Sequence, residues 1–167
     1  MSEESHHSHH DHAAGASAQA TSLNRLAVSA TLHCLTGCAI GEVLGMVIGT
    51  ALGWGNVETI ALAVVLAFIF GYSLTMLPLL RSGMALRRAV GLALAADTVS
   101  ITIMEIVDNL VMVLIPGAMH AGLDTFLFWG SLTFALIVAG IAAFPVNRWL
   151  IARGRGHAVV HAHHGHH

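Results

Sequence analysis

Two cysteines and a glutamate recur at four-residue intervals within an apolar stretch of the chain. Cys34, Cys38 and Glu42 are followed at the same interval by Met46, and His33 precedes the first cysteine. Residues four apart lie on one face of a helix, so these side chains predict a continuous stripe. Thiolate and imidazole are ligands that soft transition metals prefer, and thioether suits Cu(I) in particular. Each cysteine taken alone is equally well a small apolar residue of a core.

A later apolar stretch carries acids and a methionine within the length of one helix: Asp97, Met104, Glu105 and Asp108. Together with Glu42 these are four acids in two apolar stretches that hold no Arg or Lys between them. Inside a membrane such carboxyls must be protonated, hydrated or paired with a bound cation. The acids therefore indicate either protonated carboxyls that hydrogen-bond across helices, or a path for cations or protons.

The depths of these residues agree with a path. Both helices are expected to run outward from the same membrane face, with a rise of about 1.5 Å per residue. Counting from each helix start predicts that Asp97 lies level with Cys34, and Glu105 level with Glu42. The residues expected in the outer half are Met46, Met104 and Asp108. The result is a predicted metal ladder, with thiols and imidazole on the inner side and acids and thioethers farther out.

His120 and Asp124 are spaced four residues apart where the last helix is expected to begin. The pair predicts a place where a metal ion enters from outside. The alternative is that these side chains only cap the start of the helix.

Four apolar segments must position these side chains, and each is long enough to cross a hydrocarbon core of about 30 Å. They are expected at about 26–52, 57–80, 86–115 and 122–150. The chain of 167 residues is 56% hydrophobic and only 10% charged, whereas soluble domains are about 25% charged. This composition excludes a disordered protein, a nucleic-acid-binding protein and a secreted disulfide scaffold. The predicted fold class is all-α, a polytopic membrane protein with four transmembrane helices.

The arginines predict the orientation. With four spans, all of them fall on the membrane face shared by both termini; they are Arg25, Arg81, Arg87, Arg88, Arg148, Arg153 and Arg155. Excess arginine marks the cytoplasmic face, so both termini are expected in the cytoplasm of a bacterium, with the helices in its inner membrane. The chain then divides into a His-rich tail at 1–22, a membrane domain at 23–156 and a second His-rich tail at 157–167. Both tails are expected to be disordered, and they either capture metal or only solubilise the protein.

A ladder of glycines runs beside the cysteine stripe of the first helix. Its members are Gly37, Gly41, Gly45, Gly49 and Gly53. Small residues at every fourth position allow a neighbouring backbone to approach closely, so the ladder predicts a tight helix–helix contact. Because four helices make a small container, glycine-rich surfaces are also expected to support a homo-oligomer.

Three strings of the chain resemble a bacterial family of small four-helix integral membrane proteins, the domain of unknown function 4396. They are HCLTGCAIGE at 33–42, MEIVDN at 104–109 and AFPVNR at 143–148. The resemblance covers about residues 26–157 and implies a helical protein of the inner membrane. It implies no particular activity, so the function must be inferred from the residues.

The leading hypothesis is transport or handling of a transition-metal cation, with Cu(I) favoured and Zn(II) or another divalent ion next. The expected partners are the lipid bilayer, the metal ion, further copies of the chain and a cytoplasmic metal chaperone, with no nucleic acid. No GxxxxGK[ST] string is present, so neither a bound nucleotide nor an ATP-driven pump is expected. One alternative is a membrane redox protein that exchanges Cys34 and Cys38 with a quinone or a partner thiol. Another is a structural subunit of a membrane assembly.

Overall fold

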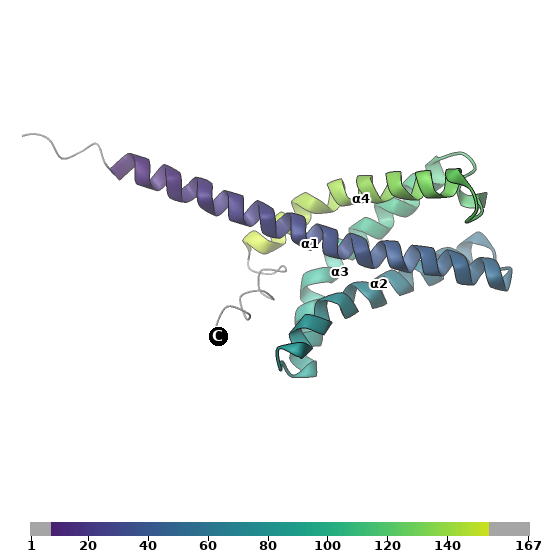
Figure 1. Ribbon diagram of the computed structural model, residues 1–167, viewed down its shortest axis with the longest axis horizontal. Coiled ribbons are helices and arrows are strands. Elements are labelled where there is room, and N and C mark those ends of the chain that lie inside the picture. The colour runs from purple at the N-terminus through teal and green to yellow at the C-terminus, as the bar shows by residue number, and fades with distance from the viewer. Residues whose placement is uncertain (1–7, 154–167) are drawn as a thin grey trace, which may run out of the picture.

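The computed structural model describes residues 8–153, with side chains from Thr21 onward. It consists of four long helices and one short 3₁₀ helix (Figure 1). In chain order these are α1 (Ser8–Leu52), α2 (Asn56–Arg81), α3 (Leu86–Leu114), η1 (Ala118–His120) and α4 (Phe126–Ala152). All four α-helices are long and apolar enough to cross a membrane, which confirms the predicted all-α class and the number of spans.

Two helix starts differ from those expected. α1 begins at Ser8, so most of the segment expected as a disordered tail continues the first helix. The alanines between residues 13 and 20 favour this continuation, since alanine is the strongest helix former. α4 begins at Phe126 rather than near residue 122, because the hydroxyl of Thr125 accepts a hydrogen bond from the backbone N–H of Phe128 at 3.2 Å and caps the helix. The second His-rich tail lies outside the described residues.

Glycines end the first two helices at the hairpin turns. Gly53 and Gly83 have φ angles of +67° and +83°, a left-handed conformation that glycine adopts without steric cost. After α1, the backbone N–H of Trp54 donates to the carbonyl of Gly49 at 2.9 Å, and that of Gly53 donates to Thr50 at 3.2 Å. This pair of bonds is the Schellman arrangement that closes a helix C-terminus. Gly53 therefore terminates α1 and does not belong to the packing ladder in which the sequence placed it.

The other four glycines of the ladder pack tightly against α2. A methyl group at Gly41 would lie 2.5 Å from Cα of Ala67, and one at Gly45 would lie 2.6 Å from Cα of Ala63. The same antiparallel register sets Gly37 against Gly71 and Gly49 against Thr59. The predicted close contact is therefore confirmed, and its partner is a helix of the same chain.

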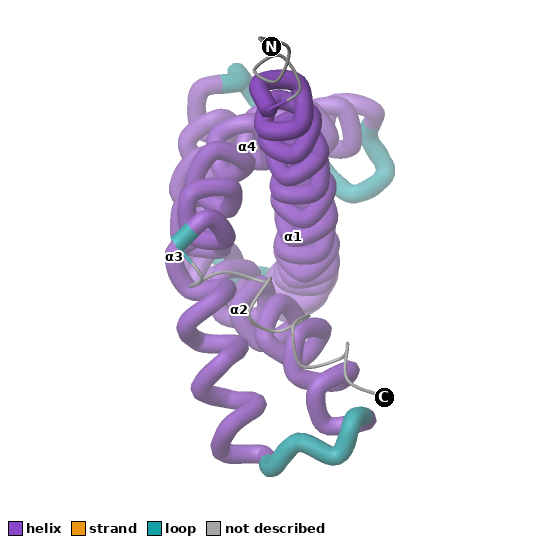
Figure 2. The backbone as a smooth tube through the Cα atoms, turned by 90° about the vertical axis from the view of Figure 1, so that its left-hand side faces the viewer, coloured by secondary structure: helices purple, strands orange, loops and turns teal. Residues whose placement is uncertain are grey.

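α1 lies at the centre of the bundle and also packs against α3 and α4. The arginines from Arg25 to Arg153 lie near the span ends at one end of the bundle, which we call the arginine end. The turns at 53–55 and 115–125 lie at the opposite end, which we call the outer end (Figure 1). Seen from the arginine end, the α2–α3 turn stands away from α1 and α4 (Figure 2). The buried core divides there in the same way. One cluster joins Leu79 of α2 to Ala89 of α3, and another joins Ala27 of α1 to Ile151 of α4.

Large apolar side chains cover the outside of the bundle. Each helix contributes some, among them Leu32, Val65, Ile106 and Ile141. Such a surface suits the hydrocarbon region of a bilayer, where exposed leucine and isoleucine meet acyl chains instead of water. The helices are therefore those of a multi-pass membrane protein.

Candidate functional site

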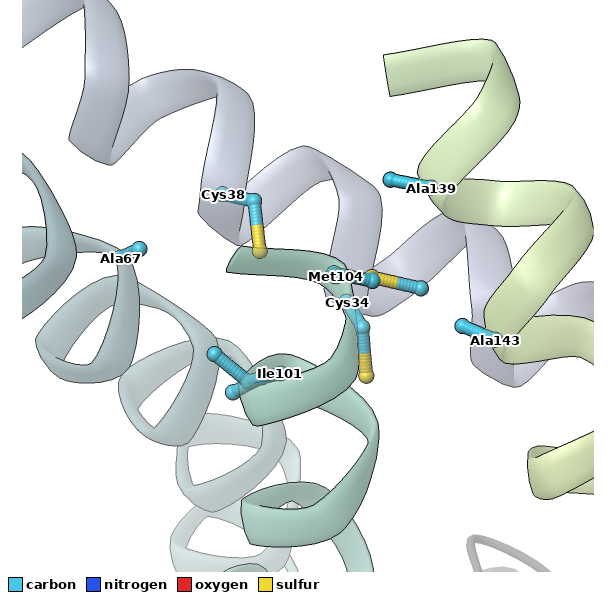
Figure 3. Packing of buried hydrophobic residues seen from close by; sticks show 7 residues of the cluster. All are labelled: Cys34, Cys38, Ala67, Ile101, Met104, Ala139 and Ala143. Carbon is cyan, nitrogen blue, oxygen red and sulfur yellow. The ribbon is translucent and has the colours of Figure 1, made fainter. Parts of the chain in front are cut away.

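The two cysteines lie in the centre of the bundle, where all four helices meet. Cys34 and Cys38 are both buried, and both are free thiols. They share one cluster with Met104 of α3 and with small residues of α2 and α4 (Figure 3). Figure 3 shows the thioether of Met104 extending towards Ala143 of α4. We call Cys34, Cys38 and Met104 the sulfur cluster.

An acid of α3 faces each of three members of the α1 stripe, Cys34, Cys38 and Glu42. The thiol of Cys34 donates to Oδ1 of Asp97 over 3.8 Å, so these residues lie level, as predicted. One turn farther along α1, Cys38 lies close to Glu105. A further turn along, Glu42 lies close to Asp108. The result is three stacked pairs that follow one line through the membrane domain.

This register corrects two of the predicted depths. Glu105 lies beside Cys38, one turn closer to the arginine end than expected, and Glu42 is paired with Asp108 instead. Met104 belongs to the sulfur cluster and not to the outer half of the bundle. These small errors arose because α1 and α3 cross at an angle (Figure 1). A count of residues along each helix assumes that the two helices are parallel.

The acids of the three pairs are deeply buried. Asp97 is 0% exposed, Asp108 1% and Glu105 4%. In the described part of the chain, neither carboxyl oxygen of Glu105 or of Asp108 has a hydrogen-bond partner. Buried polar atoms in folded proteins almost always have partners, so these four oxygens need an explanation such as a proton, a water or a cation.

Positive charge is kept away from the pairs. Within residues 21–153 every arginine lies near a membrane-span end: Arg25, Arg81, Arg87, Arg88, Arg148 and Arg153. Two of them are held there by local contacts, since Arg148 Nε donates to Asn24 Oδ1 at 2.8 Å and Arg153 stacks over the ring of Trp149 at 4.2 Å. Arginine thus cannot neutralise the buried acids.

The described side chains bring the predicted metal ligands together in pairs, not in larger sets. Among residues 21–153, no three His, Cys, Asp or Glu side chains converge closely enough to hold a metal ion. Methionine sulfur is a further possible ligand, and Met104 adds a third sulfur beside the two thiols. The donors are therefore arranged as successive two-residue stations along a line.

Met46 and His33, from the two ends of the predicted metal ladder, do not belong to the three pairs. Met46 is half-buried near the outer end of α1, where it packs with Phe128 of α4. His33 is half-buried one residue before Cys34, on the glycine side of α1, and the α1–α2 register brings it level with Thr75. His33 therefore lies beside the line of pairs and not on it.

His120 and Asp124 do not form the predicted helical pair. Both are exposed, and they belong to the 3₁₀ helix and the turn before α4. The i, i+4 spacing requires a continuous helix, and α4 starts only after Thr125. The alternative that this pair caps the helix is also wrong, because Thr125 provides the cap.

Several small or polar residues near the line of pairs were missed by the sequence analysis. Ser100 is fully buried on α3 next to Cys34, and its hydroxyl has no partner within the described residues. On α2, small or polar residues face α1 at every fourth position; they are Thr59, Ala63, Ala67, Gly71 and Thr75. This second four-residue repeat is visible in the sequence, and it would have identified α2 as the partner of the glycine ladder.

No curated protein and no solved structure shows significant similarity to the chain. A family profile described as Domain of unknown function (DUF4396) matches residues 23–156, which include all four membrane-spanning helices and the three pairs. Because this match covers most of the chain, the protein is a member of the DUF4396 family.

Proposed function

We propose that this protein transports a soft transition-metal cation across the membrane, along the three pairs between α1 and α3. The observation that carries the proposal is the column Cys34–Asp97, Cys38–Glu105 and Glu42–Asp108, in which thiols and acids are stacked in a buried line. A column of buried acids that is only packing would cost several kcal/mol unless its charges are matched. A passing cation would match them.

The sulfur cluster supports Cu(I) as the favoured cargo. Two thiols and one thioether in a dry environment provide soft ligands, whereas the carboxyls alone would equally suit harder ions. Zn(II) is the second choice, because zinc also accepts thiolate and carboxylate ligands. We further propose that both termini are cytoplasmic in a bacterial inner membrane, that the protein forms a homo-oligomer, and that a cytoplasmic metal chaperone exchanges ions with it.

Flux through purified protein in liposomes tests the proposal. Ag(I) serves as a redox-stable substitute for Cu(I), and a dye inside the vesicles reports its arrival. We expect Ag(I) flux that Cys34→Ser and Cys38→Ser each reduce at least about tenfold, because a hydroxyl is a poor ligand for a soft ion. Met76→Leu, a volume-conserving change away from the sulfur cluster, is the matched control and should conduct like the wild type.

The same vesicles separate the competing functions. Proton flux that needs Glu42 and Asp108 but not the cysteines, without Ag(I) flux, would replace the metal path by a proton path. A stable Cys34–Cys38 disulfide in the purified protein would instead favour the redox alternative, although two cysteines four apart on a helix need a distorted backbone to bridge.

A further inference from the structure

A small cavity lies at the outer end of the column of pairs. Its volume is about 50 Å³, and its wall includes residues of α1, α2, α3, η1 and α4. Glu42 and Asp108, the outermost pair, form part of this wall. The cavity, which we call the outer chamber, therefore continues the column towards the turns opposite the arginine end.

Asp108, one of the two acids in the wall of the outer chamber, is buried without a hydrogen bond in the described part of the chain. Asp108 is 1% exposed, and neither of its carboxyl oxygens has a hydrogen-bond partner among the described residues. A buried water occupies about 10–15 Å³ of such a volume, so the chamber has room for about three to five waters. A cation with six waters does not fit. An ion that reaches Asp108 must therefore have lost part of its hydration shell and needs protein ligands in exchange.

Thioethers supply such ligands from three different elements. Met46 of α1, Met112 of α3 and Met119 of η1 all line the outer chamber, which thus holds three of the seven methionines of the chain. Leucine would fill the same space with better-defined packing, so methionine at all three positions adds sulfur rather than volume. Thioether favours Cu(I) over harder cations.

The polar remainder of the wall comes from amides and a hydroxyl. Asn56 and Thr59 lie at the start of α2, and Asn109 follows Asp108 on α3. The amide nitrogen of Asn109 is already committed, because it donates to the carbonyl of Glu105 at 2.9 Å. Among the described residues no arginine lines the chamber, and the charged side chains in its wall are the acids Glu42 and Asp108.

We propose that the outer chamber is a second metal site, in which Met46, Met112 and Met119 with Asp108 hold a single, largely dehydrated soft monovalent cation. The proposal rests on the proposed transport function and specifies its outermost station. It also gives Met112 and Met119 a binding role. The chamber selects the soft ion by its thioethers, and Asp108 and Glu42 attract it by charge.

Methionine-methyl NMR of the full-length protein in detergent tests the site, with Ag(I) as the probe. The spectrum is recorded in the Cys34→Ser/Cys38→Ser variant, so that the sulfur cluster cannot report in place of the chamber. We expect Ag(I) to shift the methyl signals of Met46, Met112 and Met119, each assigned by its Met→Leu variant. The signals of Met76 and Met84, which lie towards the arginine end, should stay in place.

An affinity measurement complements the spectra. Met46→Leu/Met112→Leu should weaken Ag(I) binding at the chamber at least about tenfold, whereas Met76→Leu/Met84→Leu should not change it; both pairs preserve volume. Unmoved signals of Met46, Met112 and Met119 at saturating Ag(I) would overturn the outer chamber as a site. Shifts caused by Zn(II) but not by Ag(I) would overturn its proposed selectivity for a soft ion.

Failure of the outer chamber as a metal site can be distinguished from failure of the proposed transport function. If the methyl signals shift but liposomes show no Ag(I) flux, the chamber stands and transport does not. If flux depends on the cysteines while the methyl signals stay in place, transport stands and the chamber is refuted.

Discussion

Single residues decide which ion the column of pairs could accept. Asp97, Glu105 and Asp108 stand on α3 opposite two thiols and one carboxyl of α1, and all six side chains are buried. Thiols make the inner two pairs soft, and carboxyls make the outermost pair hard. A cation moving along the column would therefore exchange one type of ligand for another between Cys38 and Glu42.

Glu42 should act in passage and not in binding at the sulfur cluster. Glu42→Gln removes a charge with little change of volume, so we expect Ag(I) to bind at the cysteines as in the wild type while liposome flux falls at least about tenfold, equivalent to about 1.4 kcal/mol. Titration and flux on the same preparation give both values. Asp124→Asn, which removes an exposed acid of the outer turn, is the matched control and should leave both values unchanged. Full flux through Glu42→Gln would show that this pair is not on the path.

Residue types and their spacing could be read directly from the sequence, whereas the pairing could not. The four-residue stripe of α1 and the acids of α3 predicted a buried column, and the Cys34–Asp97 level is confirmed. The partner of Glu42 depended on the crossing of α1 and α3, which no periodicity within one helix contains. The predicted pair of His120 and Asp124 failed for a related reason, since it assumed a helix from about residue 122, whereas α4 begins only at Phe126.

At the scale of elements, the column exists because α1 carries two different faces side by side. Its glycine face contacts α2, and its cysteine face contacts α3 and α4. Gly37 shows how closely α1 and α2 meet, because a methyl group there would lie 2.8 Å from Cα of Gly71. Any widening of the α1–α2 contact should therefore displace the cysteines.

The glycine ladder should be intolerant of even one added methyl group. Gly41→Ala places that methyl 2.5 Å from Cα of Ala67, so we expect a loss of about 1–3 kcal/mol in the free energy of unfolding. Gly91→Ala is the matched control, because nothing lies within 4 Å of the added methyl and alanine favours the helix. Denaturation of both variants in detergent gives the comparison. Equal stability of Gly41→Ala and the wild type would mean that α1 and α2 are not in backbone contact.

The glycine ladder illustrates what a sequence can and cannot predict about helix contacts and helix bounds. Its periodicity predicted a close contact, and α2 carries a matching repeat that identifies the partner once both are compared. The helix bounds were predicted within a few residues where glycine or proline ends a helix. They were less accurate at the start of α1, which begins at Ser8, and at the start of α4, where a single threonine hydroxyl decides the cap.

At the scale of the whole molecule, the arginines and the outer chamber are separated along one axis. The arginines from Arg25 to Arg153 lie at one end, and the outer chamber lies at the other. Because α2 already covers the glycine face of α1, an oligomer would have to use other surfaces of the bundle. The four-helix architecture could be predicted from composition and run lengths alone, since a bilayer leaves few alternatives for such segments.

The arginine distribution predicts the orientation in the membrane. Reporter fusions at both termini and near Ser82 should report a cytoplasmic location, and a fusion near Ala118 should report the opposite side, since arginine-rich segments are retained in the cytoplasm. A fusion pair at Ser82 and Ala118 provides its own control, because one helix separates them. A C-terminus on the outer side would contradict a four-span protein with both ends inside.

Metal content of the purified protein tests the account most directly. The comparison uses a variant that lacks residues 1–12 and 157–167, so that the His-rich tails cannot bind metal, with and without Cys34→Ser/Cys38→Ser. After loading with Ag(I) and removal of free metal, elemental analysis should find bound metal in the first protein and a loss of the cysteine-bound fraction in the second. Equal metal content in both proteins would contradict a transmembrane metal site at Cys34 and Cys38.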